Sequence, residues 1–447
     1  MIKRILYTLL IMFPVVASAQ INTDRVMAIG RNALYFEDYV LSIQYFNQVI
    51  NAKPYLSDPY FYRGLAKINL DDFQGAESDC SEAIERNPFV VSAYQVRGLA
   101  RIQQNNFAGA IEDYTKALEF DPENIGVWHN MALCRIRQED YKGAKNDLDK
   151  LIAISPRYTK AYLMRGEVDL KQKDTLAAEK DFGKAIEIDR YDADTWASRA
   201  ILRLQQQRYK DAEADFDHAI RLSTRNSGVY INRALARYHQ NNLRGAMSDY
   251  DIALDIDPNN FIGHYNRGLL RAQVGDDNRA IQDFNFVIEM EPDNMMAIFN
   301  RGLLLDQTGD YKGAIKDYST VINEYPNFLL GYQYRAQARR KIGDVKGADA
   351  DEFKVLKAQL DKQNGVDPNK QTADNTENNK TRKKSDKNMN NYRKIVVADN
   401  EEGEEKYKSD YRGRVQDKNV NIVPQPMFVL TYYEKHDDVK RQVNYYK

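Results

Sequence analysis

The 447-residue sequence contains little cysteine, tryptophan and histidine, and its charges nearly cancel. Two cysteines, Cys80 and Cys134, are too few for a disulfide-stapled scaffold, and we expect both to be buried free thiols. The five histidines show no metal-ligand spacing, and the motifs of serine hydrolases, zinc peptidases and phosphate-binding loops are missing. Lys and Arg number 64 against 65 Asp and Glu, which gives no general attraction to nucleic acid. We therefore expect a protein that is not an enzyme and that uses no cofactor and no metal.

Long apolar runs are also scarce, and the one that stands out lies at the N-terminus. A basic start at residues 1–4 precedes an apolar run over residues 5–16 and the small-residue site Ala17-Ser18-Ala19. This order predicts a signal peptide over residues 1–19, with the mature chain beginning near Gln20. An uncleaved membrane anchor is the alternative, although the run is short for a bilayer. We expect a chain that is secreted across the inner membrane, is periplasmic and has no transmembrane span after cleavage.

A period of 34 residues organises most of the chain. Prolines recur at this spacing, first at Pro54, Pro88, Pro122 and Pro156 and again at Pro258, Pro292 and Pro326. Placing proline at position 32 divides residues 23–362 into ten repeats without insertion or deletion. The repeats are 23–56, 57–90, 91–124, 125–158, 159–192, 193–226, 227–260, 261–294, 295–328 and a capping repeat, 329–362.

Small and aromatic residues occupy fixed positions in this frame. Position 8 is always Gly or Ala, position 20 is Ala in all repeats but the first, and positions 4 and 24 are mostly aromatic. Positions 4, 8 and 11 share one helical face, as do positions 20, 24 and 27, so two helices can approach closely with rings beside the contact. Proline near position 32 ends the second helix. Each repeat is thus predicted to be a helical hairpin that buries its remaining apolar face against the next repeat, which gives an all-α solenoid.

This pattern resembles the tetratricopeptide repeat family. The resemblance covers about three quarters of the chain. It implies helix-turn-helix repeats stacked into a right-handed superhelix whose concave inner face binds ligands. The first and last repeats depart from the pattern, for example at Ser42 and Glu352, as expected of solvated caps.

One charge pattern goes beyond the usual outline of the family. Position 7 is Arg in eight repeats, position 23 is Asp in nine, and the first repeat lacks both. We predict that the two pair within each repeat as a structural charge ladder, although repeat 4 places Met131 opposite Asp147. The alternative is an arginine row for an anionic ligand, which the matched carboxylates would neutralise. The ladder includes Arg63 with Asp79, Arg233 with Asp249, Arg267 with Asp283, and Arg301 with Asp317.

The resemblance also implies which residues face the groove, namely positions 2, 5, 6, 9, 12 and 13 of the first helix. In repeats 2 to 10, positions 5, 6 and 9 hold no Lys or Arg, which argues against a clamp for a terminal carboxylate. They form an apolar, aromatic surface with a column of asparagines, similar to the ladder of the O-linked GlcNAc transferase family. Since an amide donates and accepts at once, the column could hold a peptide backbone of any sequence, unless Asn is simply common there. The predicted groove residues are Asn130, Asn232, Asn266, Asn300, Tyr265, Phe299, Phe61 and Tyr62.

The composition changes after the repeats. Residues 363–411 are polar and charged and are predicted to be a disordered linker. Residues 412–447 are β-prone and are predicted either to fold back on the solenoid or to add themselves to a partner.

These features favour a non-catalytic protein–protein interaction scaffold in the bacterial cell envelope, with partner peptides or proteins in the concave groove. The partners would be other proteins of unknown identity and not nucleic acid, and a peripheral association with an outer-membrane complex is one option. Two alternatives remain. One is a structural envelope component that binds glycan or peptidoglycan through the aromatic groove, and the other is an enzyme with the repeats as a recruiting arm.

Overall fold

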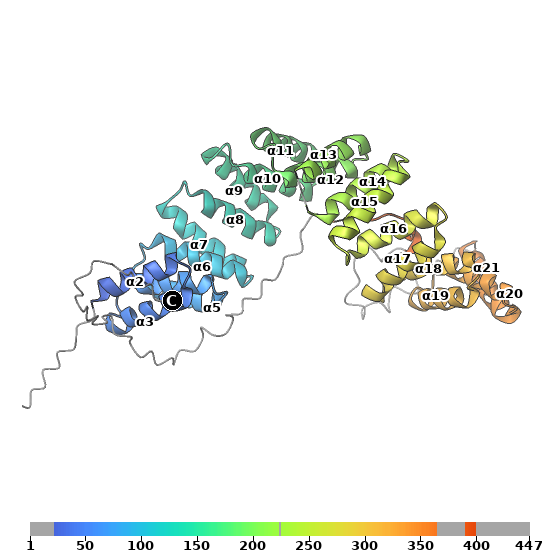
Figure 1. Cartoon of the computed structure of the whole chain (residues 1–447), viewed down its shortest axis with the longest axis horizontal. Coiled ribbons are helices and arrows are strands. Elements are labelled where there is room, and N and C mark those ends of the chain that lie inside the picture. The colour runs from blue at the N-terminus through green and yellow to red at the C-terminus, as the bar shows by residue number, and fades with distance from the viewer. Residues whose placement is uncertain (1–21, 223–224, 364–388, 399–447) are drawn as a thin grey trace, which may run out of the picture. The chain divides into compact units, whose positions relative to one another are not determined.

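The computed structural model describes residues 22–222, 225–363 and 389–398, and these contain twenty α-helices, one short 3-10 helix and no strand. Figure 1 shows the helices following one another in pairs along the chain. The all-α fold of consecutive helical hairpins that the sequence predicts is therefore confirmed. The predicted signal peptide and the β-prone tail, residues 1–19 and 412–447, lie outside the described residues.

Each predicted repeat holds two helices. The first helices are α2 (Thr23–Tyr35), α4 (Asp58–Ile68), α6 (Val91–Gln103), α8 (Ile125–Arg137), α10 (Thr159–Lys171), α12 (Ala193–Gln205), α14 (Ser227–His239), α16 (Phe261–Gln273), α18 (Met295–Thr308) and α20 (Leu329–Lys341). The second helices are α3 (Tyr39–Ala52), α5 (Phe73–Arg86), α7 (Phe107–Phe120), α9 (Tyr141–Ile154), α11 (Thr175–Ile188), α13 (Tyr209–Arg221), α15 (Leu243–Ile256), α17 (Asp277–Met290), α19 (Tyr311–Glu324) and α21 (Val345–Gln363).

The chain divides into two compact bodies, each considered by itself. The N-terminal body contains the described residues up to Asp140, with helices α2 to α8. The C-terminal body contains helices α9 to α21 together with residues 389–398, which begin with the 3-10 helix η2 (Met389–Asn391). The candidate site lies in the C-terminal body.

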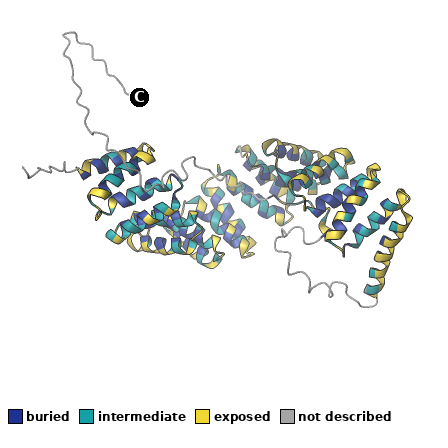
Figure 2. Cartoon of the chain, turned by 90° about the horizontal axis from the view of Figure 1, so that it is seen from below, coloured by how far each residue is buried: buried dark blue, intermediate teal, exposed yellow. Residues whose placement is uncertain are grey.

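The small residues at positions 8 and 20 are buried where the two helices of a repeat meet, as on α10 and α11. Gly166 and Ala178 are both buried, and the ring of Phe182 fills the space beside them. A Cβ atom added at Gly166 would lie 2.5 Å from Cε1 of Phe182, so the hairpin needs glycine for this close approach. In Figure 2 the buried residues follow the helix sides that face their neighbours, and exposed residues gather at the turns.

A turn of constant geometry joins the two helices of every repeat. Position 15 has a positive φ in all ten repeats, for example 66° at Lys173 and 81° at Gly275. Glycine takes this conformation without strain, but only the last three repeats have it. The next residue caps the second helix in most repeats, as where Asp174 accepts a hydrogen bond from the backbone N–H of Ala177 at 3.0 Å. The turn therefore begins the second helix at a fixed place in each repeat.

Both cysteines are free and buried, as the sequence predicts. Burial raises the pKa of the Cys80 thiol and of the Cys134 thiol to about 12, so both remain protonated at neutral pH. In repeat 10, most of α21 beyond Asp351 is exposed, including Phe353 and Leu356. A search of the described helices for one that is long and apolar enough to cross a membrane finds none.

Candidate functional site

The predicted charge ladder joins the two helices of a repeat in the eight repeats that have both residues. In repeat 7, Arg233 donates from Nε and Nη2 to both carboxylate oxygens of Asp249, at 3.0 and 2.6 Å. The same fork-to-carboxylate arrangement occurs in all eight repeats that have both residues. The other pairs named from the sequence have Nη2–Oδ1 distances of 2.5 Å for Arg63–Asp79, 2.8 Å for Arg267–Asp283 and 2.7 Å for Arg301–Asp317.

The ladder also joins one repeat to the next, which the sequence analysis missed. The remaining nitrogen of Arg233, Nη1, donates to Asp217 of repeat 6 at 2.8 Å. A second cation, Arg237, donates to Asp249 at 2.9 Å from the next turn of α14. The signal was present in the sequence as a polar residue at position 25 and a cation at position 11. Such residues on their own resemble a solvated helix face, so they did not stand out.

Burial and hydrogen bonding shift the pKa values of individual ladder carboxyls in different directions. Burial outweighs the arginine contacts at Asp113 and Asp249 and raises the pKa of each. Burial raises the pKa of the Asp283 carboxyl, but hydrogen bonds from His264 and Arg267 outweigh it and hold the pKa below its ordinary value. A carboxyl with a lowered folded-state pKa stabilises the protein at pH values above its unfolded pKa of about 3.9. That contribution is lost as the pH falls through the folded-state pKa. At neutral pH Asp283 is therefore ionised, and its contacts are structural.

The asparagine column lies on three successive first helices. Asn232 on α14, Asn266 on α16 and Asn300 on α18 occupy the same position of repeats 7, 8 and 9. Their exposed fractions are 0%, 0% and 5%, because residues 389–398 cover them. Figure 1 shows this short segment, in red, beside α16 and α18. The groove of the C-terminal body therefore already holds a peptide, which belongs to the same chain.

Two of the asparagines form reciprocal pairs with the peptide backbone. Asn266 accepts from the N–H of Val396 at 2.9 Å and donates to the carbonyl oxygen of Val396 at 2.7 Å. Asn232 does the same with Ala398, accepting at 2.9 Å and donating at 2.8 Å. Each amide thus satisfies both polar groups of one residue, as a neighbouring strand would. Neither pair involves a side chain of the peptide.

The third asparagine binds the start of the segment. Asn300 donates to the carbonyl oxygen of Tyr392 at 2.5 Å, and the hydroxyl of Tyr265 donates to the same oxygen at 2.7 Å. From Tyr392 to Ala398 the segment therefore runs from repeat 9 to repeat 7, against the order of the repeats. Between repeats 8 and 7 it advances two residues, the period at which an extended chain presents the same face.

The segment also makes apolar contacts. The Tyr392 ring meets Phe299 edge to face, with centroids 4.8 Å apart and planes at 88°. Met389 and Ala398 are buried, and Ile395 and Val396 are half-buried. In contrast, Arg393 and Lys394 are exposed, and Val397 has an exposed fraction of 37%. The groove therefore contacts some side chains of the segment, and the others are exposed to solvent.

Here the structure differs from the expectation of a disordered linker over residues 363–411. Gln363 ends α21, residues 389–398 are ordered on the groove, and the rest of that range lies outside the described residues. The prediction of disorder rested on low apolar content. It is wrong for the ten residues 389–398, because backbone hydrogen bonds do much of the binding and require no particular composition.

The other predicted groove residues are placed differently. Phe299 is fully buried and packs edge to face on Phe328, so it belongs partly to the core. Asn130 on α8 is half-buried in the N-terminal body. Phe61 and Tyr62, also in that body, are half-buried with ring centroids 5.0 Å apart. The structure thus brings Asn232, Asn266, Asn300, Tyr265 and Phe299 together, and these five form the candidate site.

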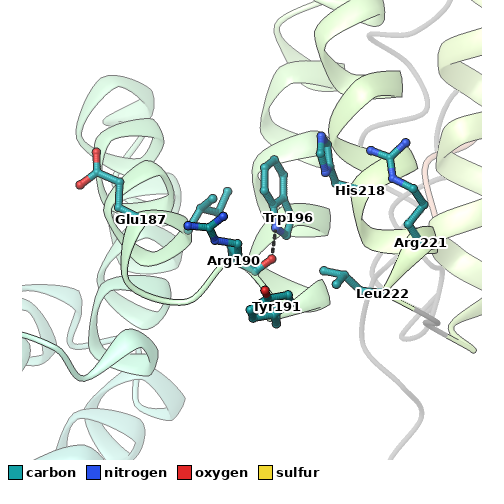
Figure 3. Close-up of a pocket in the computed structure, with 8 residues that line it drawn as sticks. Glu187, Arg190, Tyr191, Trp196, His218, Arg221 and Leu222 are labelled. Carbon is teal, nitrogen blue, oxygen red and sulfur yellow. Dashed lines mark hydrogen bonds between the residues drawn. The ribbon is translucent and has the colours of Figure 1, made fainter.

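A second hollow of the C-terminal body lies at the ends of α11 and α13 and the start of α12 (Figure 3). The Trp196 ring stacks on His218, with centroids 4.3 Å apart, and its N–H donates to the carbonyl oxygen of Arg190 at 3.0 Å. Arg190 and Arg221 also line the hollow. The tryptophan already uses its ring face and its N–H within the protein, so we do not assign a ligand to this hollow.

Stacked helical hairpins with a peptide in the groove define a helical repeat protein of the interaction-scaffold class. Family models described as "TPR repeat" and "Tetratricopeptide repeat" match this chain. The first matches residues 98–134, and the second matches residues 125–158, 159–192, 198–261 and 265–327. The chain belongs to the tetratricopeptide repeat family. Proteins of this family are generally non-catalytic scaffolds that bind other proteins or peptides.

Several solved structures are similar to the chain. A tetratricopeptide repeat protein from Parabacteroides merdae is 21% identical, with 56% of this chain and 98% of that chain covered and a TM-score of 0.44. PilF of Pseudomonas aeruginosa is 20% identical, with coverages of 45% and 92% and a TM-score of 0.40. YrrB, described as a TPR protein with an unusual peptide-binding site, is 18% identical, with coverages of 41% and 95% and a TM-score of 0.38. No curated protein matches the chain.

Proposed function

We propose that this protein is a non-catalytic scaffold that binds extended polypeptides of partner proteins in the groove of repeats 7 to 9. The observation that carries the proposal is the reciprocal pairing of Asn266 and Asn232 with the backbone of Val396 and Ala398. Groups that satisfy both the N–H and the C=O of a residue select an extended peptide backbone. The groups that pair with these amides belong to a peptide backbone, so the geometry favours a peptide over the glycan alternative.

The test requires a chain in which residues 389–398 no longer occupy the groove. Proline has no N–H, so the double substitution Val396→Pro and Ala398→Pro removes the two donors that Asn266 and Asn232 accept. A labelled synthetic peptide with the sequence of residues 389–398 is the probe. Its affinity for the full-length double-proline chain is measured by fluorescence anisotropy.

In that chain, replacing Asn232, Asn266 and Asn300 together with Ala is expected to weaken probe binding by about 2–4 kcal/mol, or about thirty- to thousandfold. Five side-chain hydrogen bonds to the peptide are lost. Helical content by circular dichroism should hardly change, because these amides bind mainly the peptide. The matched control is Asn130→Ala, at the same position of repeat 4, which should leave the affinity unchanged. A triple variant that binds the probe as tightly as its parent would rule out the asparagine column.

We also propose that the scaffold works in the cell envelope, as a periplasmic protein. The support is the order of residues 1–19, with a basic start, an apolar run and an Ala-Ser-Ala site. Expression in a Gram-negative host should yield a periplasmic chain whose N-terminal sequence begins at Gln20. A chain recovered from the cytoplasm with residues 1–19 intact would contradict this assignment.

A further inference from the structure

The segment on the groove has a side-chain pattern that the repeats select. Tyr392 is held through its ring by Phe299 and through its carbonyl by Asn300 and Tyr265. An aromatic residue in this place gains an edge-to-face contact in addition to apolar burial. The groove therefore favours an aromatic residue at this position. The hydrogen bonds alone would not, because they bind only the backbone.

Two further positions are apolar for related reasons. Ile395 packs against the core cluster of repeats 6 and 7 that includes Val229 and Leu235, and Val396 packs against the cluster around Phe299. Both side chains are half-buried, so their contribution depends on apolar area. Polar residues in their places would lose that burial.

The position of Ala398 demands a small side chain. Ala398 is buried against the cluster that contains Ile231, Tyr250 and Leu270, while both its backbone groups bind Asn232. A larger residue would have to displace this packing or break the amide pair. Arg393, Lys394 and Val397 face solvent, so the groove leaves their identity free.

We propose that residues 389–398 are an internal mimic of the partner. The peptide that the groove takes from another protein has an aromatic residue, aliphatic residues three and four places later and a small residue six places later. It binds extended, runs from repeat 9 to repeat 7 and displaces the mimic. This inference rests on the proposed function. It adds which side chains the partner peptide should carry and that this peptide competes with residues 389–398 for the groove.

The competition follows from covalent attachment. The mimic is separated from α21 by residues 364–388 of the same chain, so its binding is intramolecular. The effective concentration of a tethered ligand is on the order of millimolar. A partner peptide with the same intrinsic affinity as the mimic must be present above this concentration to displace it. Weak ligands therefore cannot compete with the mimic, whereas tighter or multivalent ligands can.

The first experiment compares full-length chains for binding of the labelled 389–398 probe. The chain with Val396→Pro and Ala398→Pro is expected to bind the probe about 10- to 100-fold more tightly than the unsubstituted chain, because its own segment competes poorly. Val397→Pro is the matched control, since it adds a proline at an exposed residue and retains the paired N–H groups of Val396 and Ala398. It should behave like the unsubstituted chain. If the unsubstituted and double-proline chains bind the probe with equal affinity, residues 389–398 do not compete for the groove and the proposal of an internal mimic is wrong.

A second measurement avoids any substitution in the protein. In the unsubstituted chain, the N–H groups of Val396 and Ala398 should exchange slowly with deuterium, and excess unlabelled probe should accelerate their exchange. Exchange that does not respond to a saturating peptide would contradict displacement.

The side-chain pattern is tested with substituted probes on the double-proline chain. Tyr392→Ala and Ala398→Leu in the probe should each reduce the affinity at least tenfold, whereas Lys394→Ala, at an exposed residue, should have little effect. If all three bind alike, the proposed selectivity is wrong. That result would leave the asparagine column untouched, because the triple asparagine variant tests the backbone contacts separately.

Discussion

Replacing Asp249 with Ala is expected to destabilise the C-terminal body by about 3–5 kcal/mol. Asp249 has an exposed fraction of only 1% and binds Arg233 through both carboxylate oxygens and Arg237 through one. Its removal leaves two largely buried guanidinium groups without their shared carboxylate. Because the ladder also links neighbouring repeats through Asp217, the loss should spread beyond one hairpin. Urea unfolding followed by circular dichroism measures the change.

A double-mutant cycle shows whether the pair itself is responsible. The substitution Arg233→Met gives repeat 7 the residue that repeat 4 has at Met131. In that background, the loss of unfolding free energy caused by Asp249→Ala should be smaller by at least about 1 kcal/mol, because one of the two buried cations that would lose its carboxylate is absent. Asp251→Ala on the same helix is the matched control. The Asp251 side chain is 51% exposed, so its contact with Arg267 should contribute at most about 1 kcal/mol. The same loss from Asp249→Ala in both backgrounds would show that Arg233 and Asp249 are not coupled.

The repeat architecture could be read from the sequence because one constraint recurs ten times. A helical hairpin closes only where small residues meet, and this requirement leaves Gly or Ala at position 8 and Ala or Ser at position 20. Helix α14 begins at Ser227, the first residue of the predicted seventh repeat. The ladder could also be predicted, since eight repeats have both the Arg and the Asp and the first repeat lacks both, which suggests a contact. Periodicity makes each repeat a check on the others.

The content of the groove could not be read in this way. Residues 389–398 occur once, so no period marks them, and most of their hydrogen bonds to the groove use backbone atoms that every residue has. The asparagine column indicated a surface that could hold a backbone. It could not indicate that a segment more than ninety residues after Asn300 in the sequence would lie there, because that contact depends on chain topology and not on local pattern.

Replacing Phe182 with Ala is expected to destabilise the C-terminal body by about 3–5 kcal/mol. The Phe182 ring is fully buried against the helix–helix contact of repeat 5, and a Cβ at Gly166 would lie 2.5 Å from it. The two helices are held at this separation by the backbone at Gly166 and Ala178, so they cannot easily close the space that the ring leaves. The cavity therefore persists and adds its own cost to the lost burial.

Repeats of the same chain supply the control for this change. Position 24 is Tyr in repeats 3, 7 and 9, each time fully or nearly fully buried, so Phe182→Tyr should cost far less than Phe182→Ala. Urea unfolding measured by circular dichroism should place the Tyr variant near the unsubstituted chain and the Ala variant well below it. An Ala variant within about 1 kcal/mol of the unsubstituted chain would mean that the helices relax into the space. The ring at position 24 would then not set the spacing of the hairpin.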